Sequence, residues 1–427
     1  MGKLVVIVTF GSFGDINPYV GLALELKQRG HSPVIATAEF YRSYIEGQGI
    51  WFHPVRPDID PRDTGAMARI MDPKRGTEFL FKEFLLPRVR ESYEDLAEAV
   101  RSADLLVTHP VTFAGPLVSE KEGVPWVSTV LAPVSFFSAH ELPIVSPYPW
   151  LATLRRLGPD VGRLLVGLSK RSTWRWTEPV RRLRTDLGLS PGKDPIYEGQ
   201  FSPRLVLGMF SRVLAYPKPD WPPNVRITGQ VFYDGPSTNR NLQPGLARFL
   251  DSGPAPVVFT LGTSAVEAAG SFYRESLDAA RRLGVRAVLL VGNNPKNRLP
   301  VPLPEGIVAF DYAPFSEIFP RSAAVVHQGG IGTMGQALRS GRPMLVVPFA
   351  HDQPDNALRA KGLGVARLVY PWRYSARRVA GHLRILLEEP GYRARAGEVA
   401  KQVRSEDGVG AACAAIEELL VHPRCSR

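Results

Sequence analysis

The sequence has few cysteines and no long apolar run, and both absences narrow the class of protein. Cys413 and Cys425 are its only cysteines in 427 residues. Two cysteines make no disulfide framework and suggest no metal site, so we expect a reducing compartment. The first apolar run, residues 4–10, is too short for a signal-peptide core or a membrane span, and no other run reaches spanning length. We therefore expect a soluble, cytoplasmic protein.

Acidic residues are also in deficit, and the net charge is +11. An anionic ligand, an anionic membrane surface or nucleic acid would each suit this balance. The excess is concentrated in residues 151–184, which hold nine Lys and Arg against two acids, together with Trp174 and Trp176. We favour a helix with a solvated basic face and an aromatic side chain in the core. The alternative is an amphipathic helix that contacts lipid at the inner face of a membrane.

Short apolar runs alternate with helical patterns along the whole chain. Runs such as "KLVVIVTF", "DLLVTH", "APVVFTLGT" and "PMLVVPF" lack polar/apolar alternation. Strands that are buried on both faces have this pattern, and they occur in parallel sheets covered by helices. The sequence therefore predicts an α/β fold with two doubly wound units.

A segment rich in Gly, Pro, Ser and Asn separates the two β-α series. We predict an N-terminal domain over residues 1–232, a linker over 233–244 and a C-terminal domain over 245–400. The tail, residues 401–427, contains a helix. Ligands of such sheets bind beyond the carboxyl ends of the strands, so functional residues are expected directly after strands.

In the first half, Asp15 and His109 both follow strands. Asp15 comes after a turn with Gly11 and Gly14, and it suits either a helix cap or a base in the cleft. The glycine spacing lacks the fingerprint of a dinucleotide-binding loop. For His109 a structural and a catalytic role fit equally well.

In the second half, Thr263 and Ser264 follow a strand and offer hydroxyl and amide groups to anionic oxygens, although they also suit a helix cap. Tyr312 leaves another strand and is followed by Ala313. Its ring can stack on a base while neighbouring backbone reads the base edge, but a tyrosine at a strand end is also ordinary core material.

The segment "HQGGIGTMGQALRSGRPMLVVPFAHDQPDNA" holds the densest group of candidates. His327 ends a strand, and the glycine turn from Gly330 to Thr333 leads into a helix whose N-terminus favours negative charge. The next strand ends at Asp352 and Gln353, whose side chains suit sugar hydroxyls. Helix caps alone do not explain this order, and we predict a site for the diphosphate and sugar of a nucleotide sugar.

With "GSFGDINP" near the N-terminus and "DYAPFSEIFP" before His327, the chain resembles family-one glycosyltransferases of the GT-B fold. The nearest resemblance is to the bacterial branch with antibiotic and sterol glycosyltransferases and the rhamnolipid rhamnosyltransferase. It covers nearly the whole chain and is weakest between residues 57 and 200. It implies two Rossmann-like domains that face each other across a cleft, with the tail helix packed on the first.

The resemblance also implies roles for single residues. Asp15 occupies the position of the catalytic base. The diphosphate is assigned to His327, Gly330, Gly332, Thr333, Thr263 and Ser264; the base to Tyr312 and Ala313; and the sugar to Asp352 and Gln353.

Three positions depart from the plant pattern. Gly335 stands where plant members have a ribose-binding Glu, with Gln336 beside it, so UDP- and dTDP-sugars are equally acceptable. Phe315 replaces a Gln. His109 stands where plant members have an Asp, which suggests a catalytic pair of Asp15 and His109 with the residue types exchanged.

We therefore expect an inverting, metal-independent hexosyltransferase without a cofactor. It would use a UDP- or dTDP-sugar and a hydroxyl of a lipophilic acceptor, such as a natural product, phenol, sterol or lipid, and would have no nucleic-acid partner. The apolar stretch "VLAPVSFFSAHELPIVSPYPW" motivates the choice of acceptor. The alternatives are an NAD- or FAD-dependent oxidoreductase and a non-catalytic protein that binds nucleotide sugars or lipids.

Overall fold

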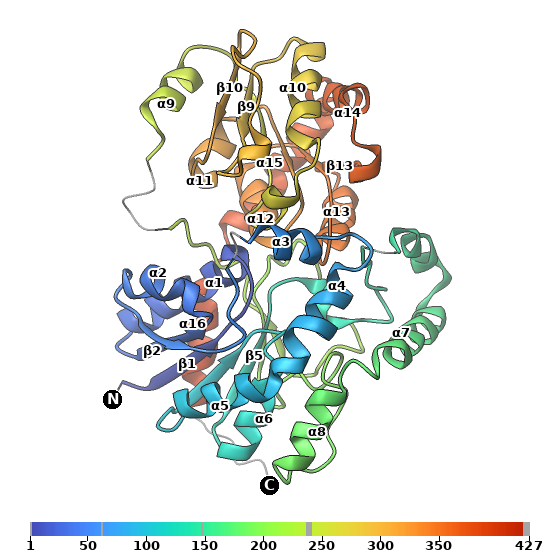
Figure 1. Cartoon of the computed structure of the whole chain (residues 1–427). Coiled ribbons are helices and arrows are strands. Elements are labelled where there is room, and N and C mark those ends of the chain that lie inside the picture. The colour runs from blue at the N-terminus through green and yellow to red at the C-terminus, as the bar shows by residue number, and fades with distance from the viewer. Residues whose placement is uncertain (1, 61–62, 147, 236–240, 422–427) are drawn as a thin grey trace.

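The computed structural model of the protein describes residues 2–60, 63–146, 148–235 and 241–421, which form two parallel sheets with helices packed around them (Figure 1). The first sheet has the order β3-β2-β1-β4-β5-β6-β7. Its strands are β1 (Leu4–Val8), β2 (Ser32–Thr37), β3 (Trp51–Pro54), β4 (Leu105–Thr108), β5 (Trp126–Val130), β6 (Val206–Gly208) and β7 (Val225–Ile227). The second sheet has the order β10-β9-β8-β11-β12-β13. Its strands are β8 (Val257–Thr260), β9 (Ala287–Leu290), β10 (Ile307–Phe310), β11 (Ala324–His327), β12 (Met344–Val346) and β13 (Ala366–Leu368).

Helices connect the strands, as the alternation in the sequence predicts. Around the first sheet they are α1 (Phe13–Gln28), α2 (Arg42–Glu46), α3 (Thr64–Ile70), α4 (Gly76–Glu78), α5 (Val89–Ala99), α6 (Ala114–Glu122), the 3₁₀ segment η5 (Pro149–Leu157), α7 (Pro159–Thr173) and α8 (Glu178–Asp186). The later ones are α9 (Pro244–Asp251), the 3₁₀ turn η7 (Ala265–Ala268), α10 (Phe272–Leu283), α11 (Phe315–Ile318), α12 (Ile331–Ser340), α13 (Gln353–Gly362), α14 (Ala376–Glu388), α15 (Pro390–Arg404) and α16 (Gly408–Val421). The predicted α/β class, with two doubly wound units, is confirmed.

The order of strands reverses at one point in each sheet, between β1 and β4 in the first and between β8 and β11 in the second. The connections from neighbouring strands leave in opposite directions there and open a crevice for ligands. Asp15 follows β1 and His109 follows β4, while Thr263 follows β8 and His327 ends β11. The candidates from the sequence therefore gather at the two reversal points.

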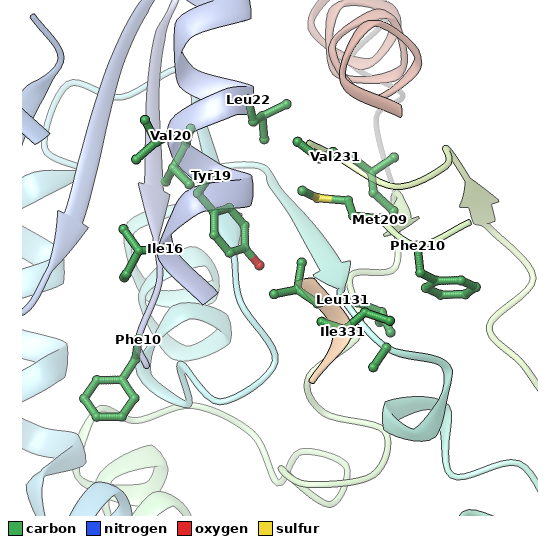
Figure 2. Close-up of a cluster of buried hydrophobic side chains, with 14 of the residues drawn as sticks. Phe10, Ile16, Tyr19, Val20, Leu22, Leu131, Met209, Phe210, Val231 and Ile331 are labelled. Carbon is green, nitrogen blue, oxygen red and sulfur yellow. The ribbon is translucent and has the colours of Figure 1, made fainter. Parts of the chain in front are cut away.

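The central strands are buried, and one apolar cluster extends from the first sheet to the start of α12. Figure 2 shows Phe10 at the end of the first strand region, Tyr19 on α1, and Ile331 of α12 beside Leu131. Since α12 belongs to the second unit, its N-terminus is held against the first unit by apolar packing. The two units are therefore in direct apolar contact beside the crevice.

The chain returns to the first unit at its end, where α16 packs against α1 (Figure 1). Arg29 Nη1 donates to Glu417 at 3.0 Å, and the thiol of Cys413 is buried against the carbonyl of Leu22 at 3.9 Å. The predicted linker, 233–244, lies partly outside the described residues, and so do Cys425 and the end of the predicted tail. The division at 232, 244 and 400 remains a prediction.

No helix in the described part of the chain is long and apolar enough to cross a membrane. The basic stretch agrees only in part with the interpretation that we favoured. Trp176 packs against the core of the first unit, as expected. Trp174, however, is 51% exposed, and on α7 the leucines Leu164 and Leu168 are 63% and 55% exposed, so several apolar side chains of this stretch lie in solvent.

Candidate active site

A cavity of about 350 Å³ lies between the two sheets, at the reversal points. We call it the central cavity. Nine of the residues selected from the sequence line it: Asp15, His109, Thr263, Ser264, Gly330, Gly332, Thr333, Asp352 and Gln353. Its remaining wall is largely apolar, with Phe10, Ile59, Met67, Ile70, Leu80, Phe81, Leu131 and Phe137. Polar groups thus converge at one end of a hollow whose other surface suits an apolar molecule.

Asp15 lies in the first turn of α1, where the capping serine fixes one carboxylate oxygen. The Oδ2 atom accepts from the Ser12 N–H at 2.8 Å and from the Ser12 hydroxyl at 3.2 Å. The Oδ1 atom lies 3.7 Å from His109 Nε2. One oxygen therefore completes the capping box of α1, and the other faces the cavity and His109, where a base in the cleft would have to lie.

The backbone around His109 indicates which ring nitrogen carries the proton. Nδ1 accepts from the Val111 N–H at 3.3 Å, so in the neutral ring the proton lies on Nε2. That N–H points toward Asp15. The structure therefore brings the suggested Asp15–His109 pair together, in an arrangement where the imidazole can orient the carboxylate.

The first turn of α12 presents backbone N–H groups to the cavity. Gly330 precedes the helix, and Gly332 and Thr333 lie in its first turn, where backbone N–H groups have no partner within the helix. After the neighbouring strand β8, Ser264 directly precedes η7 and also lines the cavity. A diphosphate between these two segments would receive donors from both.

His327 lies elsewhere than the sequence predicted. Its side chain is completely buried and does not line the central cavity. Nδ1 accepts from the Gly329 N–H at 3.1 Å, and Nε2 lies 3.4 Å from the sulfur of Met344. Burial lowers the pKa of His327 to about 3, so the ring is neutral. In this arrangement the imidazole holds the glycine turn, in which Gly329 has φ +91°, and gives no direct donor to a phosphate.

Two amide replacements distinguish the roles of the two nitrogens of His327. Asparagine places an oxygen near the former Nδ1, and glutamine places an amide nitrogen near the former Nε2. We expect His327→Asn to retain most of the affinity for UDP and dTDP in calorimetry. His327→Gln and His327→Ala should weaken binding and lower the free energy of unfolding by about 2–4 kcal/mol. Better retention by glutamine than by asparagine would support a direct phosphate contact instead.

Asp352 and Gln353 lie at the start of α13, after β12. Asp352 Oδ2 accepts from the N–H of Ile331 at 3.2 Å and from Asn356 Nδ2 at 2.7 Å, so this carboxylate also touches the first turn of α12. Gln353 Oε1 accepts from the N–H groups of Phe349 and Ala350 at 2.8 and 3.2 Å. These bonds hold both side chains in place on the wall of the cavity.

Burial, with the nearby charge of Asp15, raises the pKa of Asp352 to about 7. A carboxyl whose pKa rises on folding stabilises the fold most at low pH and loses that contribution as the pH rises. We expect Asp352→Asn to be more stable than wild type at pH 8, by roughly 1–3 kcal/mol. In urea titrations the difference should grow between pH 4 and 7 and then level off. A difference that is constant with pH would contradict the shifted carboxyl.

The residues assigned to the base lie outside the central cavity. Tyr312 is 54% exposed and free to stack on a planar ring, whereas Ala313 is buried. Gln336 donates to Asp234 Oδ1 at 2.6 Å. An added Cβ at Gly335 would lie 2.9 Å from the side chain of Gln230, so a larger residue has little space there.

The sequence reasoning missed two residues that line the cavity. Gln328 donates to Thr333 Oγ1 at 3.3 Å, and its own Oε1 is buried without a partner among the described residues. His351, just before Asp352, adopts φ +56°, which is uncommon outside glycine. Its Nδ1 lies 3.3 Å from Thr77 Oγ1 across the cavity, and its buried Nε2 also has no partner in the described part of the chain. In the sequence, only the positions of Gln328 beside His327 and of His351 beside Asp352 pointed to these two residues.

A second, larger hollow of about 990 Å³ lies between α6 and α8. It shares only His109 and Pro110 with the central cavity and contains none of the candidates from the second half. The smaller cavity is therefore the candidate active site. Across the described residues, no group of three or more His, Cys, Asp or Glu side chains is arranged to hold a metal ion.

Two family models match the chain. Residues 5–136 match the N-terminal domain of glycosyltransferase family 28, and residues 274–418 match the C-terminal domain of proteins like erythromycin biosynthesis protein CIII. O-mycaminosyltylonolide 6-deoxyallosyltransferase of Streptomyces fradiae is 32% identical over 97% of both chains. A sterol 3-beta-glucosyltransferase of Yarrowia lipolytica is 26% identical over 99% of this chain, which spans 29% of that longer protein.

Solved structures show the same fold. The spinosyn forosaminyltransferase SpnP superimposes with a TM-score of 0.72 at 18% identity, covering 99% of this chain and 100% of that one. The glycosyltransferase VinC, solved in complex with dTDP, has a TM-score of 0.66 at 20% identity, covering 97% and 98%. Both are GT-B glycosyltransferases, with two Rossmann-like domains.

Proposed function

Because the chain belongs to the glycosyltransferases of the GT-B fold, the group of the antibiotic and sterol glycosyltransferases, we propose that it transfers a hexose from a UDP- or dTDP-sugar to a hydroxyl of a lipophilic small molecule. The observation that carries the proposal is the central cavity. A carboxylate on α1 and the N-terminus of α12 face this one space from opposite units. With a base on one side and an anion site on the other, the cavity suits a displacement at the anomeric carbon of a sugar bound between them.

In the proposed reaction the acceptor oxygen attacks the anomeric carbon while the bond to the diphosphate oxygen breaks. Asp15 Oδ1 takes the proton of the acceptor hydroxyl, and His109 keeps the carboxylate oriented. Negative charge grows on the leaving diphosphate, where the first turn of α12, with Thr263 and Ser264, supplies preorganised donors. A single displacement inverts the configuration of the anomeric carbon. No step requires a metal ion or a cofactor.

The proposal assigns the hexose to Asp352 and Gln353, the base to Tyr312 and Ala313, and the ribose to Gln336. The dTDP in the structure of VinC supports dTDP as the nucleotide. Gln230 leaves little space for an acid at Gly335, so recognition of a ribose 2′-hydroxyl is not favoured, and UDP- and dTDP-sugars both remain in the proposal.

The apolar wall of the cavity supports a lipophilic acceptor. The names of the relatives, one acting on a glycosylated tylonolide and one on sterols, point to the same class. A matrix of UDP- and dTDP-sugars against macrolide, phenolic, sterol and lipid alcohols, read by mass spectrometry, tests the proposal. The anomeric coupling constant of the product, by NMR, tests inversion. Retention, or no transfer with any pair while the nucleotide binds normally, would reject the mechanism.

A further inference from the structure

Apolar side chains gather on the outer side of the first unit. In the described residues twelve large apolar side chains are clearly exposed, and six of them come from positions 148–174: Tyr148 (52%), Trp150 (58%), Leu157 (60%), Leu164 (63%), Leu168 (55%) and Trp174 (51%). The segment forms η5, α7 and the residue after α7. Figure 1 shows α7 at the periphery, away from both sheets. The reaction proposed above uses none of these residues.

The exposed positions of α7 follow the helical repeat. Leu164, Leu168 and Arg171 are exposed and lie three or four residues apart, so they share one face, and the exposed Arg163 lies at its edge. On the inner side Gly162 is buried, and an added Cβ there would lie 2.0 Å from the carbonyl oxygen of Ala139. The helix is therefore seated closely on the protein by one face and presents leucines and arginines on the other.

Six of the cations of this segment form ion pairs, and the other three are unpaired among the described residues. Residues 151–184 contain nine Lys and Arg and two acids. Arg156, Arg171 and Arg175 form no ion pair or side-chain hydrogen bond with any residue that the structure describes. Free guanidinium groups beside exposed leucines and tryptophans match the two layers of a lipid interface, with phosphates outside and acyl chains beneath.

Inward contacts hold the segment in a fixed position. Arg155 donates to the carbonyl of Leu142 at 2.8 Å and pairs with the buried Asp355 of α13. Ser169 lies 2.7 Å from the hydroxyl of Tyr197. Since α13 begins at Gln353, the exposed surface is attached beside the sugar end of the central cavity. A preformed surface binds with little ordering cost.

We propose that η5, α7 and Trp174 form a docking surface for an anionic lipid bilayer. The leucines and tryptophans enter the interface, and the unpaired arginines contact lipid phosphates. An acidic protein would need only the cations of this surface. A bilayer would also take up the exposed leucines and tryptophans between the cations, so the combination favours lipid. This proposal concerns location and is independent of which sugar and acceptor react.

Sedimentation with vesicles tests the surface. One set contains phosphatidylcholine alone, and the other contains about one third phosphatidylglycerol. We expect clear binding to the anionic set, weakened by salt because exposed charges are screened. The double variant Leu164→Glu, Leu168→Glu and the double variant Arg171→Glu, Arg175→Glu should each bind about tenfold more weakly. Circular dichroism and binding of UDP or dTDP should stay as in wild type, because none of these residues lines the central cavity.

A control variant carries one apolar and one arginine replacement by glutamate at another place on the surface. Trp372 is 59% exposed and Arg377 is also exposed, so Trp372→Glu with Arg377→Glu should bind vesicles like wild type. Absence of binding to the anionic vesicles would overturn the proposal, as would binding that both α7 variants retain. If the α7 arginine variant alone lost binding and polyglutamate competed fully with the vesicles, an acidic protein partner would replace lipid.

Discussion

Replacing Asp15 with asparagine is expected to lower the turnover number by roughly a hundredfold to ten-thousandfold. The amide oxygen can still accept from the Ser12 N–H, so the cap of α1 is preserved. The acceptor proton, however, has no carboxylate to receive it. Nucleotide affinity should stay near wild type, because the first turn of α12 is unchanged. Single-turnover kinetics and calorimetry with UDP and dTDP measure the two quantities separately.

The pair His109→Gln and His109→Phe tests how the carboxylate is oriented. Glutamine keeps a donor near the former Nε2, which lies 3.7 Å from Asp15 Oδ1, whereas phenylalanine keeps the ring volume without a donor. We expect the phenylalanine variant to be slower and to show an altered pH–rate profile, and the glutamine variant to be less affected. Equal rates in wild type and both variants would reduce His109 to a packing residue. Wild-type turnover of Asp15→Asn would remove Asp15 from the mechanism.

Gly332→Leu is expected to reduce the affinity for UDP and dTDP about a hundredfold or more, because the side chain would displace the diphosphate from its donors. A Cβ at this position meets no atom within 4 Å, and Gly332 lines the central cavity. The added side chain would therefore enter the space that we propose for the diphosphate, without disturbing the core.

Gly381 provides the matched control for that change. It lies in α14, and a Cβ there also meets nothing within 4 Å. Gly381→Leu should leave nucleotide binding unchanged, and both variants should gain slightly in stability because glycine is a poor helix former. If Gly332→Leu bound nucleotide normally, the diphosphate would have to lie elsewhere.

Much of the fold could be predicted because parallel strands are buried on both faces and therefore read as apolar runs. The strands that begin at residues 4, 105, 257 and 324 lie where the apolar runs of the sequence predicted them. The stretch from Pro149 to Thr173 could not be predicted in the same way. Leucines at helical spacing describe a buried face and an exposed apolar face equally well, and only the position of α7 on the first unit decides between them.

The sequence could predict which strand ends carry the residues of the candidate site. The reversal points of the sheets bring Asp15, His109 and Asp352 together, and general rules of α/β topology anticipate this. The direction of the His327 ring was not predictable, since it depends on the packing of Met344 beneath it. Paired α/β units also allowed a dinucleotide-dependent oxidoreductase. Because the chain belongs to the glycosyltransferases, this alternative function is excluded.

The contact of α16 with α1 has a consequence for the order of events during synthesis. Arg29 and Glu417 are separated by 388 positions. The face of α1 that α16 covers must remain uncovered while the ribosome adds the entire second unit. The first unit therefore cannot complete its packing against α16 until the second unit has been synthesised, although it emerges first.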